Sequence, residues 1–298
     1  MADRESEILA RIAPGVGAVS GWDSLAGDHP FVSQAFLAAL EGSGSVGPGT
    51  GWTPAPLIVE DEGALVAAAP AYLKTHSQGE YVFDHGWADA WERAGGAYYP
   101  KLQVAVPFTP VPGPRLLGLR PQQLLAACEA VAVQNGLSSA HVTFLEEADA
   151  SEAERRGWLI RQGLQYHWFN RGYRDFDDFL HSLTSRKRKA IRKERAVARE
   201  GLEFRALSGA EIGADEWDAM WRFYQDTGSR KWGRPYLTRD FFDRIGAAMG
   251  ERLLLFLACR DEIPIAGALN VVGPGALYGR YWGCVDEVRF LHFELSYY

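Results

Sequence analysis

The order of helix-type and strand-type segments limits the fold of this 298-residue chain more than any other feature. Two apolar runs around an acidic turn at Gly63 predict a hairpin, and residues 101–108 predict a buried strand. A helix is expected over residues 121–134, and residues 138–145 predict a further strand. This alternation is typical of an α/β unit.

A second cycle of segments occupies the rest of the chain. Apolar residues at helical spacing predict one long amphipathic helix over residues 176–198, and two more helices are expected over 214–226 and 239–250. Three strand-type runs follow, and their turn signals at 261–262 and 273–275 are typical of a meander. The second half therefore repeats the α/β character of the first.

The length of the chain fits two domains, which we place at residues 1–165 and 166–298. The predicted fold class is α/β (α+β), with mixed sheets flanked by helices. The sequence stops at Tyr298, a few residues into what is expected to be another helix. A sheet without its next strands would keep an open edge, so we expect the second half to be truncated at its C-terminus.

Composition excludes several classes of protein. Apolar residues make up 47% of the chain and charged residues 23%, which predicts a globular protein and not a disordered one. We expect a cytoplasmic location, because the sequence has no signal-peptide pattern and no apolar run near the ~20 residues that span a bilayer. Cys128, Cys259 and Cys284 form no CxxC pair, so we expect no disulfide framework and no metal site. The oligomeric state is not indicated.

The net charge of −7 argues against general DNA binding, but basic residues are concentrated in one segment. With Glu194 and Glu200 included, this segment carries +6, and its basic members are Arg186, Lys187, Arg188, Lys189, Arg192, Lys193, Arg195 and Arg199. Such a helix could hold a polyanion, namely the phosphates of coenzyme A, a tRNA or a nucleotide-linked cell-wall precursor. The alternative is a solvated helix face with partners one turn away.

Other candidate site residues are clustered in both halves. Tyr278, Arg280 and Trp282 alternate along a predicted strand and should share one of its faces, with Tyr281 on the other. A guanidinium buried among aromatic side chains in a core would need polar partners, so we expect Arg280 to be part of a functional site.

Two residues near the C-terminus are candidates for a general base. His292 and Glu294 follow at the start of the last expected helix, and each could take a proton if its pKa lay near neutrality. The alternative for Glu294 is an acid that favours the helix dipole.

In the first half, Asp84 and Lys101 are the most informative residues of an irregular, aromatic-rich segment. Three interpretations are open for this segment: recognition of the acceptor, a structural lid, or an ordinary polar loop.

Long motifs in both halves resemble those of a known family. GEYVFDHGWADAWERAGGAYYPKLQVAVPFTPVPGPRLL, SRKRKAIRKER, WGRPYLTRDFF and LYGRYWGC are similar to segments of bacterial predicted N-acyltransferases, which are related to the FemA, FemB and FemX peptidoglycan-bridge aminoacyltransferases. The resemblance implies a tandem GNAT-type fold. It also implies that Thr227 and Arg230 lie near the acceptor site, with Tyr236 as a further candidate, and that the strand of Tyr278 runs beside the reacting carbonyl.

From this resemblance we expect direct transfer of an acyl group from acyl-CoA to an amine, without a metal or a covalent enzyme intermediate. Two alternatives stay open. The first is transfer of an aminoacyl group from a charged tRNA to a peptidoglycan precursor. The second is a non-catalytic module that binds a cell-wall precursor or nucleic acid through the basic helix. The expected partners are thus a small amine or cell-wall precursor and, in the first alternative, tRNA.

Overall fold

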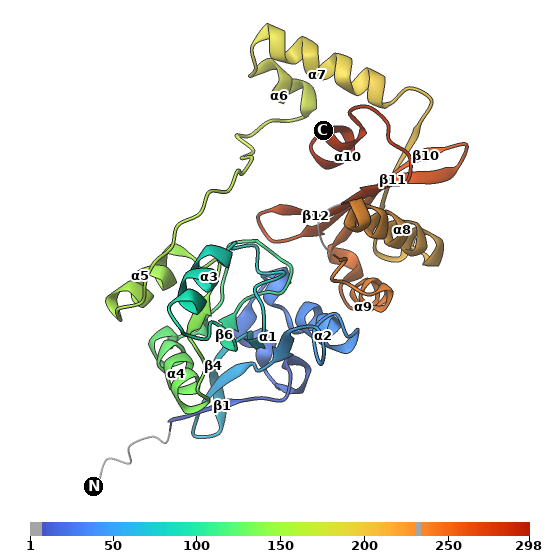
Figure 1. Cartoon of the computed structure of the whole chain (residues 1–298). Helices are drawn as coiled ribbons and strands as arrows, with labels where there is room; N and C mark the ends of the chain where they lie inside the picture. The colour runs from blue at the N-terminus through green and yellow to red at the C-terminus, as the bar shows by residue number, and fades with distance from the viewer. Residues whose placement is uncertain (1–7, 231–233) are drawn as a thin grey trace. The chain divides into compact units, whose positions relative to one another are not determined.

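The computed structural model describes residues 8–230 and 234–298, which form two compact units (Figure 1). The first unit comprises the chain up to Gln162 together with Tyr236–Ala248, and the second comprises Gly163–Pro235 and Met249–Tyr298. Counted over the sequence, the first unit carries a formal charge of −9 and the second +2, which together give the net −7. The charge of the chain is therefore divided unevenly between its units.

The first unit contains two four-stranded sheets. Sheet A has the strand order β1-β3-β4-β7 and sheet B the order β2-β5-β6-β8, in which only the β6–β8 pair is parallel. The strands are β1 (Ile8–Ile12), β2 (Trp52–Pro54), β3 (Leu57–Asp61), β4 (Ala64–Ala69), β5 (Ala71–Lys74), β6 (Lys101–Val104), β7 (Leu117–Gly118) and β8 (Ala140–Val142). The α-helices are α1 (Trp22–Ala26), α2 (Gln34–Gly42), α3 (His85–Arg93), α4 (Pro121–Gln134), α5 (Glu147–Arg155) and α9 (Arg239–Met249), and the 3-10 helices are Val16–Ala18 and Pro30–Val32.

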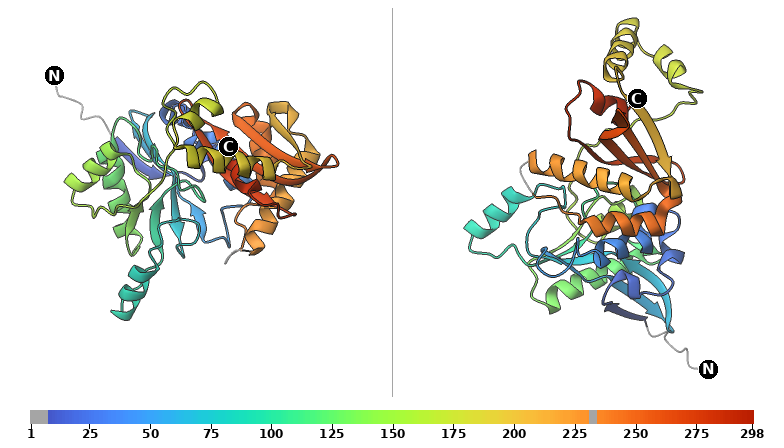
Figure 2. Two further views of the ribbon diagram at one scale, coloured as in Figure 1. Left: turned by 90° about the horizontal axis from the view of Figure 1, so that it is seen from above. Right: turned by 90° about the vertical axis from the view of Figure 1, so that its right-hand side faces the viewer.

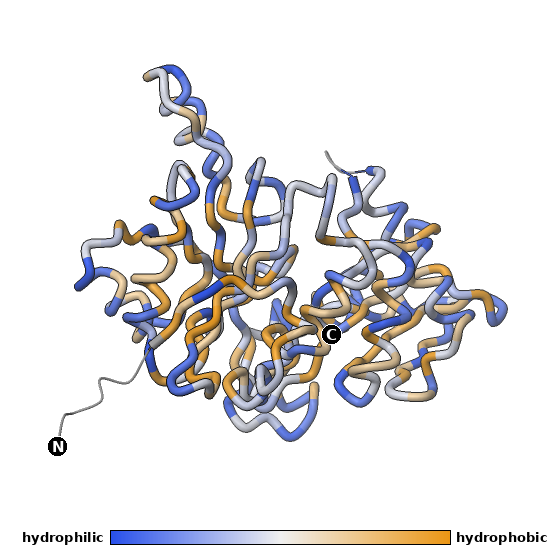
Figure 3. The backbone as a smooth tube through the Cα atoms, turned by 90° about the horizontal axis from the view of Figure 1, so that it is seen from below, coloured by the Kyte–Doolittle hydropathy of each residue, from blue (hydrophilic) through white to orange (hydrophobic). Residues whose placement is uncertain are grey.

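Apolar side chains from both sheets meet α4 in one core. Val59 of β3, Leu102 and Val104 of β6, and Leu124 and Leu125 of α4 are all completely or almost completely buried there. In Figure 3, which colours the backbone by hydropathy, apolar stretches in orange run through the part of the fold next to the N-terminus. The predicted hairpin around Gly63 and the predicted helix over 121–134 are present as β3–β4 and α4.

The other face of sheet B is buried but polar. Residues paired across neighbouring strands share a face, and Lys74 pairs with Lys101 while Gln103 pairs with Tyr72 and His141. The apolar residues of these strands alternate with them and face the core instead. A buried polar face is uncommon and indicates a structural or functional network.

The chain returns to the first unit after the second unit has begun. Phe241 of α9 packs edge-on against Phe36 of α2, with ring centroids 5.8 Å apart. Thr238 donates to the Ser43 carbonyl and accepts the amide of Phe241. These contacts attach α9 to α2. The assignment of residues 1–165 and 166–298 to separate acyltransferase-type domains stays a prediction.

The second unit is built around one antiparallel sheet with the strand order β12-β11-β10-β9. Its elements are α6 (Phe176–His181), α7 (Ser185–Ala198), β9 (Glu203–Ser208), α8 (Ala214–Arg230), β10 (Leu253–Arg260), β11 (Ile263–Val272), β12 (Leu277–Cys284) and α10 (Leu291–Ser296), with 3-10 helices at Gly209–Glu211 and Gly250–Arg252. Phe223 and Met220 of α8 pack on one face of the sheet at Gly267, and Leu291 and Leu295 of α10 pack on the other. The predicted meander is therefore present.

Three expected segments differ from the structure. The single helix predicted over 176–198 is two helices, because Thr184 adopts an extended conformation and its hydroxyl accepts the Lys187 amide as the N-cap of α7. The irregular segment around Asp84 contains α3. The predicted connector beginning at Thr227 is helical as far as Arg230, and its residues 231–233 lie outside the described part of the chain.

Candidate functional site

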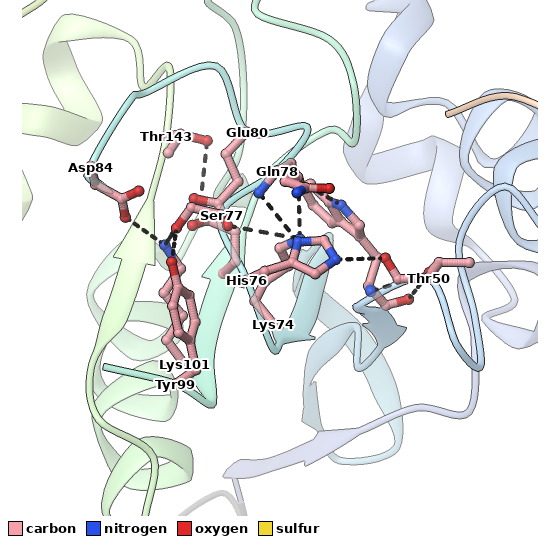
Figure 4. A network of polar contacts seen from close by, with 12 residues as sticks. Thr50, Lys74, His76, Ser77, Gln78, Glu80, Asp84, Tyr99, Lys101 and Thr143 are labelled. Carbon is pink, nitrogen blue, oxygen red and sulfur yellow. Dashed lines mark hydrogen bonds and ion pairs between the residues drawn. The ribbon is translucent and has the colours of Figure 1, made fainter. Parts of the chain in front are cut away.

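A cluster of charged side chains lies on the polar face of sheet B (Figure 4). The buried Lys101 ammonium donates to Ser77 Oγ at 2.9 Å, to Glu80 Oε2 at 2.8 Å and to Asp84 Oδ2 at 2.8 Å. Tyr98 donates its hydroxyl to the same Asp84 oxygen at 2.9 Å. Because these bonds use all three ammonium protons, Lys101 fixes the segment that carries Glu80 and Asp84 onto β6.

The second lysine of the cluster, Lys74, is equally buried but less well paired. Its Nζ atom lies 3.3 Å from the Gln78 carbonyl oxygen, 3.9 Å from Glu80 Oε1 and 3.6 Å from the centroid of the Trp52 ring. Burial lowers the pKa of Lys74 to about 7, although the Glu80 charge opposes this shift. Lys74 was not predicted as a site residue, and its only sequence signal is a lysine at the end of an apolar strand.

Hydrogen bonds and burial act in opposite directions on Asp84. Burial would raise the pKa of this carboxyl, but hydrogen bonds from Lys101, Ser77 and Tyr98 lower it to about 2. Burial and the positive charge of Lys101 lower the pKa of nearby His141 to about 4. The predicted residues Asp84 and Lys101 are thus brought together in a buried salt bridge, and their role in acceptor recognition stays a prediction.

The loop that carries these carboxylates has a strained backbone. Tyr81 and Phe83 have φ values of 60° and 52°, a left-handed conformation that costs a non-glycine residue on the order of 1–3 kcal/mol. Glu80 and Asp84 are buried, whereas the Phe83 side chain is 74% exposed. The ionic cluster therefore holds a loop conformation that turns aromatic residues toward solvent.

In the second unit, a β-bulge changes the predicted faces of β12. Leu269 pairs with Tyr281 and Asn270 pairs with Gly279, so Arg280 is the extra residue of the bulge. Tyr278 is consequently opposite Val271 and Trp282 is opposite Ala268, two positions of β11 that point to opposite sides. The prediction that Tyr278, Arg280 and Trp282 share one face is therefore wrong.

The end of α8 contacts the last residues of β12. Gly283 lies so close to α8 that an added Cβ would be 2.1 Å from the Phe223 carbonyl oxygen and 2.8 Å from Thr227 Oγ1. Arg230 donates to the Cys284 carbonyl oxygen at 3.1 Å and pairs with Glu287. The structure thus brings Thr227 and Arg230 beside the strand that carries Arg280.

Tyr236, the third residue implied by the resemblance, belongs to the first unit. Its ring stacks on Phe108 with centroids 4.7 Å apart and an interplanar angle of 5°. Thr227 and Arg230 belong to the second unit. A shared site of Tyr236 with these two residues stays a prediction.

The two candidate bases on α10 have different surroundings. Glu294 is buried, and its carboxylate accepts two hydrogen bonds of 2.9 Å from Arg195, with Arg199 Nε at 3.7 Å. A carboxylate held in this way joins α10 to α7. His292 is exposed, and its ring lies 5.0 Å from the ring of Trp282.

The basic residues of α7 fall on two different faces. Arg188, Arg192, Arg195 and Arg199 are spaced by four, three and four residues, and they contact the Leu180 and Leu183 carbonyls, Asp177 and Glu294. A second stripe of exposed residues has the spacing three and four and makes no ion pair within the described chain: Arg186, Lys189 and Lys193. Lys187 lies beside this stripe and is also exposed.

Other site types receive no support from the described residues. They include no group of three or more His, Cys, Asp or Glu residues placed to hold a metal ion, and none of their helices is long and apolar enough to cross a membrane. Burial raises the pKa of the Cys284 thiol, which weakens it as a nucleophile. A surface pocket of about 630 Å³ in the second unit contains none of the predicted site residues and is lined by Arg205, Asp215, Glu216, Asp218, Trp221, Arg222, Glu262 and Pro264.

Comparison with known proteins places these features in a family context. Residues 17–298 match the FemAB-like family of peptidoglycan biosynthesis/recognition. Among solved structures, that of FemX is similar, with a TM-score of 0.53 and 13% sequence identity over 94% of this chain and 81% of that chain. No curated protein matches. The mixed α/β architecture is thus shared with FemX, and because the family match spans nearly the whole sequence, the chain belongs to the FemAB-like family.

Proposed function

We propose that this chain transfers an aminoacyl group from an aminoacyl-tRNA to an amine of a peptidoglycan precursor. The family description supports a peptidoglycan precursor as the acceptor. The match to the FemAB-like family supports a tRNA-borne donor over the acyl-CoA that was first expected. Acyl-CoA is therefore the competing donor in the experiment below.

The bulge in β12 is the observation that carries this proposal. Transfer to an amine builds negative charge on the carbonyl oxygen of the donor, and this charge needs hydrogen-bond donors or a cation beside it. β12 is an edge strand in the described sheet, and the extra residue Arg280 interrupts its regular pairing. The main-chain amides at the bulge and the Arg280 guanidinium would bind the carbonyl oxygen of the donor.

We assign the proton-accepting role to His292 and not to Glu294. The acceptor amine must lose a proton during transfer, so the base has to be reachable from solvent or substrate. The His292 side chain is exposed next to Trp282 on β12, whereas Arg195 occupies both oxygens of Glu294. Thr227, beside Gly283, would help to orient the acceptor.

The second stripe of exposed basic residues on α7 supports RNA as the carrier of the donor. The first and last residues of this stripe, Arg186 and Lys193, are seven positions apart, or about 10 Å along a helix, and Lys189 lies between them. Three exposed cations in a row over this length fit successive backbone phosphates, and neutralising each phosphate releases counterions. The second unit, which carries this stripe, is also the positively charged one.

The test compares the two donors in parallel. The full chain is incubated with a peptidoglycan precursor and either aminoacyl-tRNA or acyl-CoA, and loss of each donor is measured over a series of salt concentrations. We expect consumption of aminoacyl-tRNA only. Replacing Arg186, Lys189 and Lys193 by alanine should reduce the salt dependence of tRNA binding by about 2–3 in log–log slope, whereas the ion-paired Arg192→Ala control should change it by less than 1. Consumption of acyl-CoA alone would contradict the proposal.

A further inference from the structure

Four exposed aromatic side chains lie on one short segment of the first unit. Tyr81 and Phe83 belong to the strained loop, and Trp87 and Trp91 belong to α3. The indoles of Trp87 and Trp91 are 64% and 54% exposed, and their spacing of four residues places them on the same side of the helix. Figure 2 shows α3 standing out from the first unit, and Ala88 is its only buried residue. We call these four residues the α3 aromatic surface.

Two contacts hold the α3 aromatic surface in place, one at the start of α3 and one at Trp91. Asp84 precedes α3 and is bound by Lys101 and Tyr98, so the start of the helix is fixed to sheet B. Trp91 lies against the main chain of Gly96, where an added Cβ would be 2.2 Å from the indole nitrogen. Rigid aromatic side chains lose little conformational entropy when a ligand binds to them. The strained backbone at Tyr81 and Phe83 does not place their side chains in the core, because both side chains are exposed.

The charge of the first unit restricts the ligand of this surface. The unit carries −9, and Asp89 and Glu92 on α3 are exposed while Arg93 is the only Lys or Arg of the helix. Nucleic acids and the anionic surface of a bilayer are repelled by such a unit. An uncharged ligand with an apolar face and hydroxyl groups is not repelled. Pyranose rings have this chemistry, because their C–H face stacks on aromatic rings and their hydroxyls donate to carboxylates.

We infer that the α3 aromatic surface binds the N-acetylated sugar rings of the peptidoglycan precursor. The choice of sugar rests on the proposed function, since the acceptor amine belongs to a precursor that also carries sugars. The surface itself lies in the first unit, whereas the residues assigned to transfer lie in the second.

Binding of a neutral sugar oligomer tests this inference directly. The full chain is titrated with an N-acetylglucosamine tetramer by isothermal titration calorimetry. Trp87→Ala and Trp91→Ala should each weaken binding about tenfold, which corresponds to about 1.4 kcal/mol. Trp168→Ala is the matched control, because this second-unit tryptophan is 63% exposed and should leave the affinity unchanged. Far-UV circular dichroism of the variants checks that they remain folded.

Several results would overturn the inference. Wild-type chain that binds no sugar, or equal affinities for the wild type and both α3 variants, would exclude a sugar site at this surface. Binding to phosphatidylglycerol vesicles that disappears in Trp87→Ala would identify a membrane surface instead, and self-association that disappears would identify a second copy. Transfer to a sugar-free peptide amine separates this inference from the proposed function. The α3 variants should retain that reaction, whereas its absence in the wild type would contradict only the proposed function.

Discussion

The two buried lysines of sheet B should respond very differently to the same substitution. Lys101→Met removes the donor of three hydrogen bonds of 2.8–2.9 Å and leaves Glu80 and Asp84 buried without their main partner. Removing one partner of a buried ion pair typically costs about 3–5 kcal/mol. We therefore expect Lys101→Met to destabilise the first unit by this amount.

Lys74→Met is the matched control, because Lys74 has the same burial on the neighbouring strand. Glu80 lies 3.9 Å from Lys74 and would keep its 2.8 Å bond to Lys101 in this variant. The ammonium that the substitution removes is itself disfavoured by burial, which lowers the pKa of Lys74. Methionine preserves most of the side-chain volume, so the free energy of unfolding should change by less than about 1.5 kcal/mol.

Hydrogen exchange followed by mass spectrometry measures this contrast locally, which matters because a chain with two units need not unfold in one step. Peptides covering residues 76–84 and 98–104 should exchange faster in Lys101→Met by a factor on the order of 100 or more. In Lys74→Met, the exchange rates of the same peptides should be almost unchanged. Equal protection of these peptides in both variants would refute the claim that Lys101 holds the loop.

Further predictions concern the same contacts. The pKa of Asp84 is lowered to about 2, so the ionised carboxylate should contribute about 2 kcal/mol to the free energy of unfolding above pH 4. This contribution should be lost as the pH falls toward 2. In Asp84→Asn, acid unfolding should lack this pH-dependent loss of stability. Glu294→Gln should lower the free energy of unfolding by about 2 kcal/mol in urea titrations, because it weakens the bonds from Arg195; unchanged stability would argue against a structural role. Gly283→Ala should cost about 1–3 kcal/mol and reduce transfer, since its Cβ would displace the Phe223 carbonyl; a neutral effect on thermal unfolding would contradict the close α8–β12 contact.

Strongly periodic segments were predictable from sequence. The hairpin at Gly63 has two apolar runs and a turn that adopts positive φ at Glu62 and Gly63, and α4 begins at Pro121 where the proline fits the first helical turn. These signals are local, so the structure agrees with them. The break before α7 was also signalled locally by Thr184, but the apolar spacing on both sides of it continued the helical period and concealed the cap.

Features that depend on pairing between strands were not predictable. Nothing in the order Tyr278, Gly279, Arg280 specifies a bulge, which exists only as a register shift against β11. Similarly, the contact of Lys74 with the Lys101 cluster requires the register of β5 and β6. Asp84 and Lys101 were found as candidates because their segment is rich in charged and aromatic residues, and that signal does not specify a partner.

We propose that the chain moves an aminoacyl group onto a peptidoglycan precursor, and mass spectrometry of the precursor detects that product. After incubation with aminoacyl-tRNA, the precursor should gain the mass of one aminoacyl residue, and Arg280→Ala and His292→Ala should each reduce the initial rate by at least about tenfold while the chain stays folded. A precursor that binds but never gains mass, with either tRNA or acyl-CoA as donor, would contradict the proposed transfer and identify the chain as a binding module.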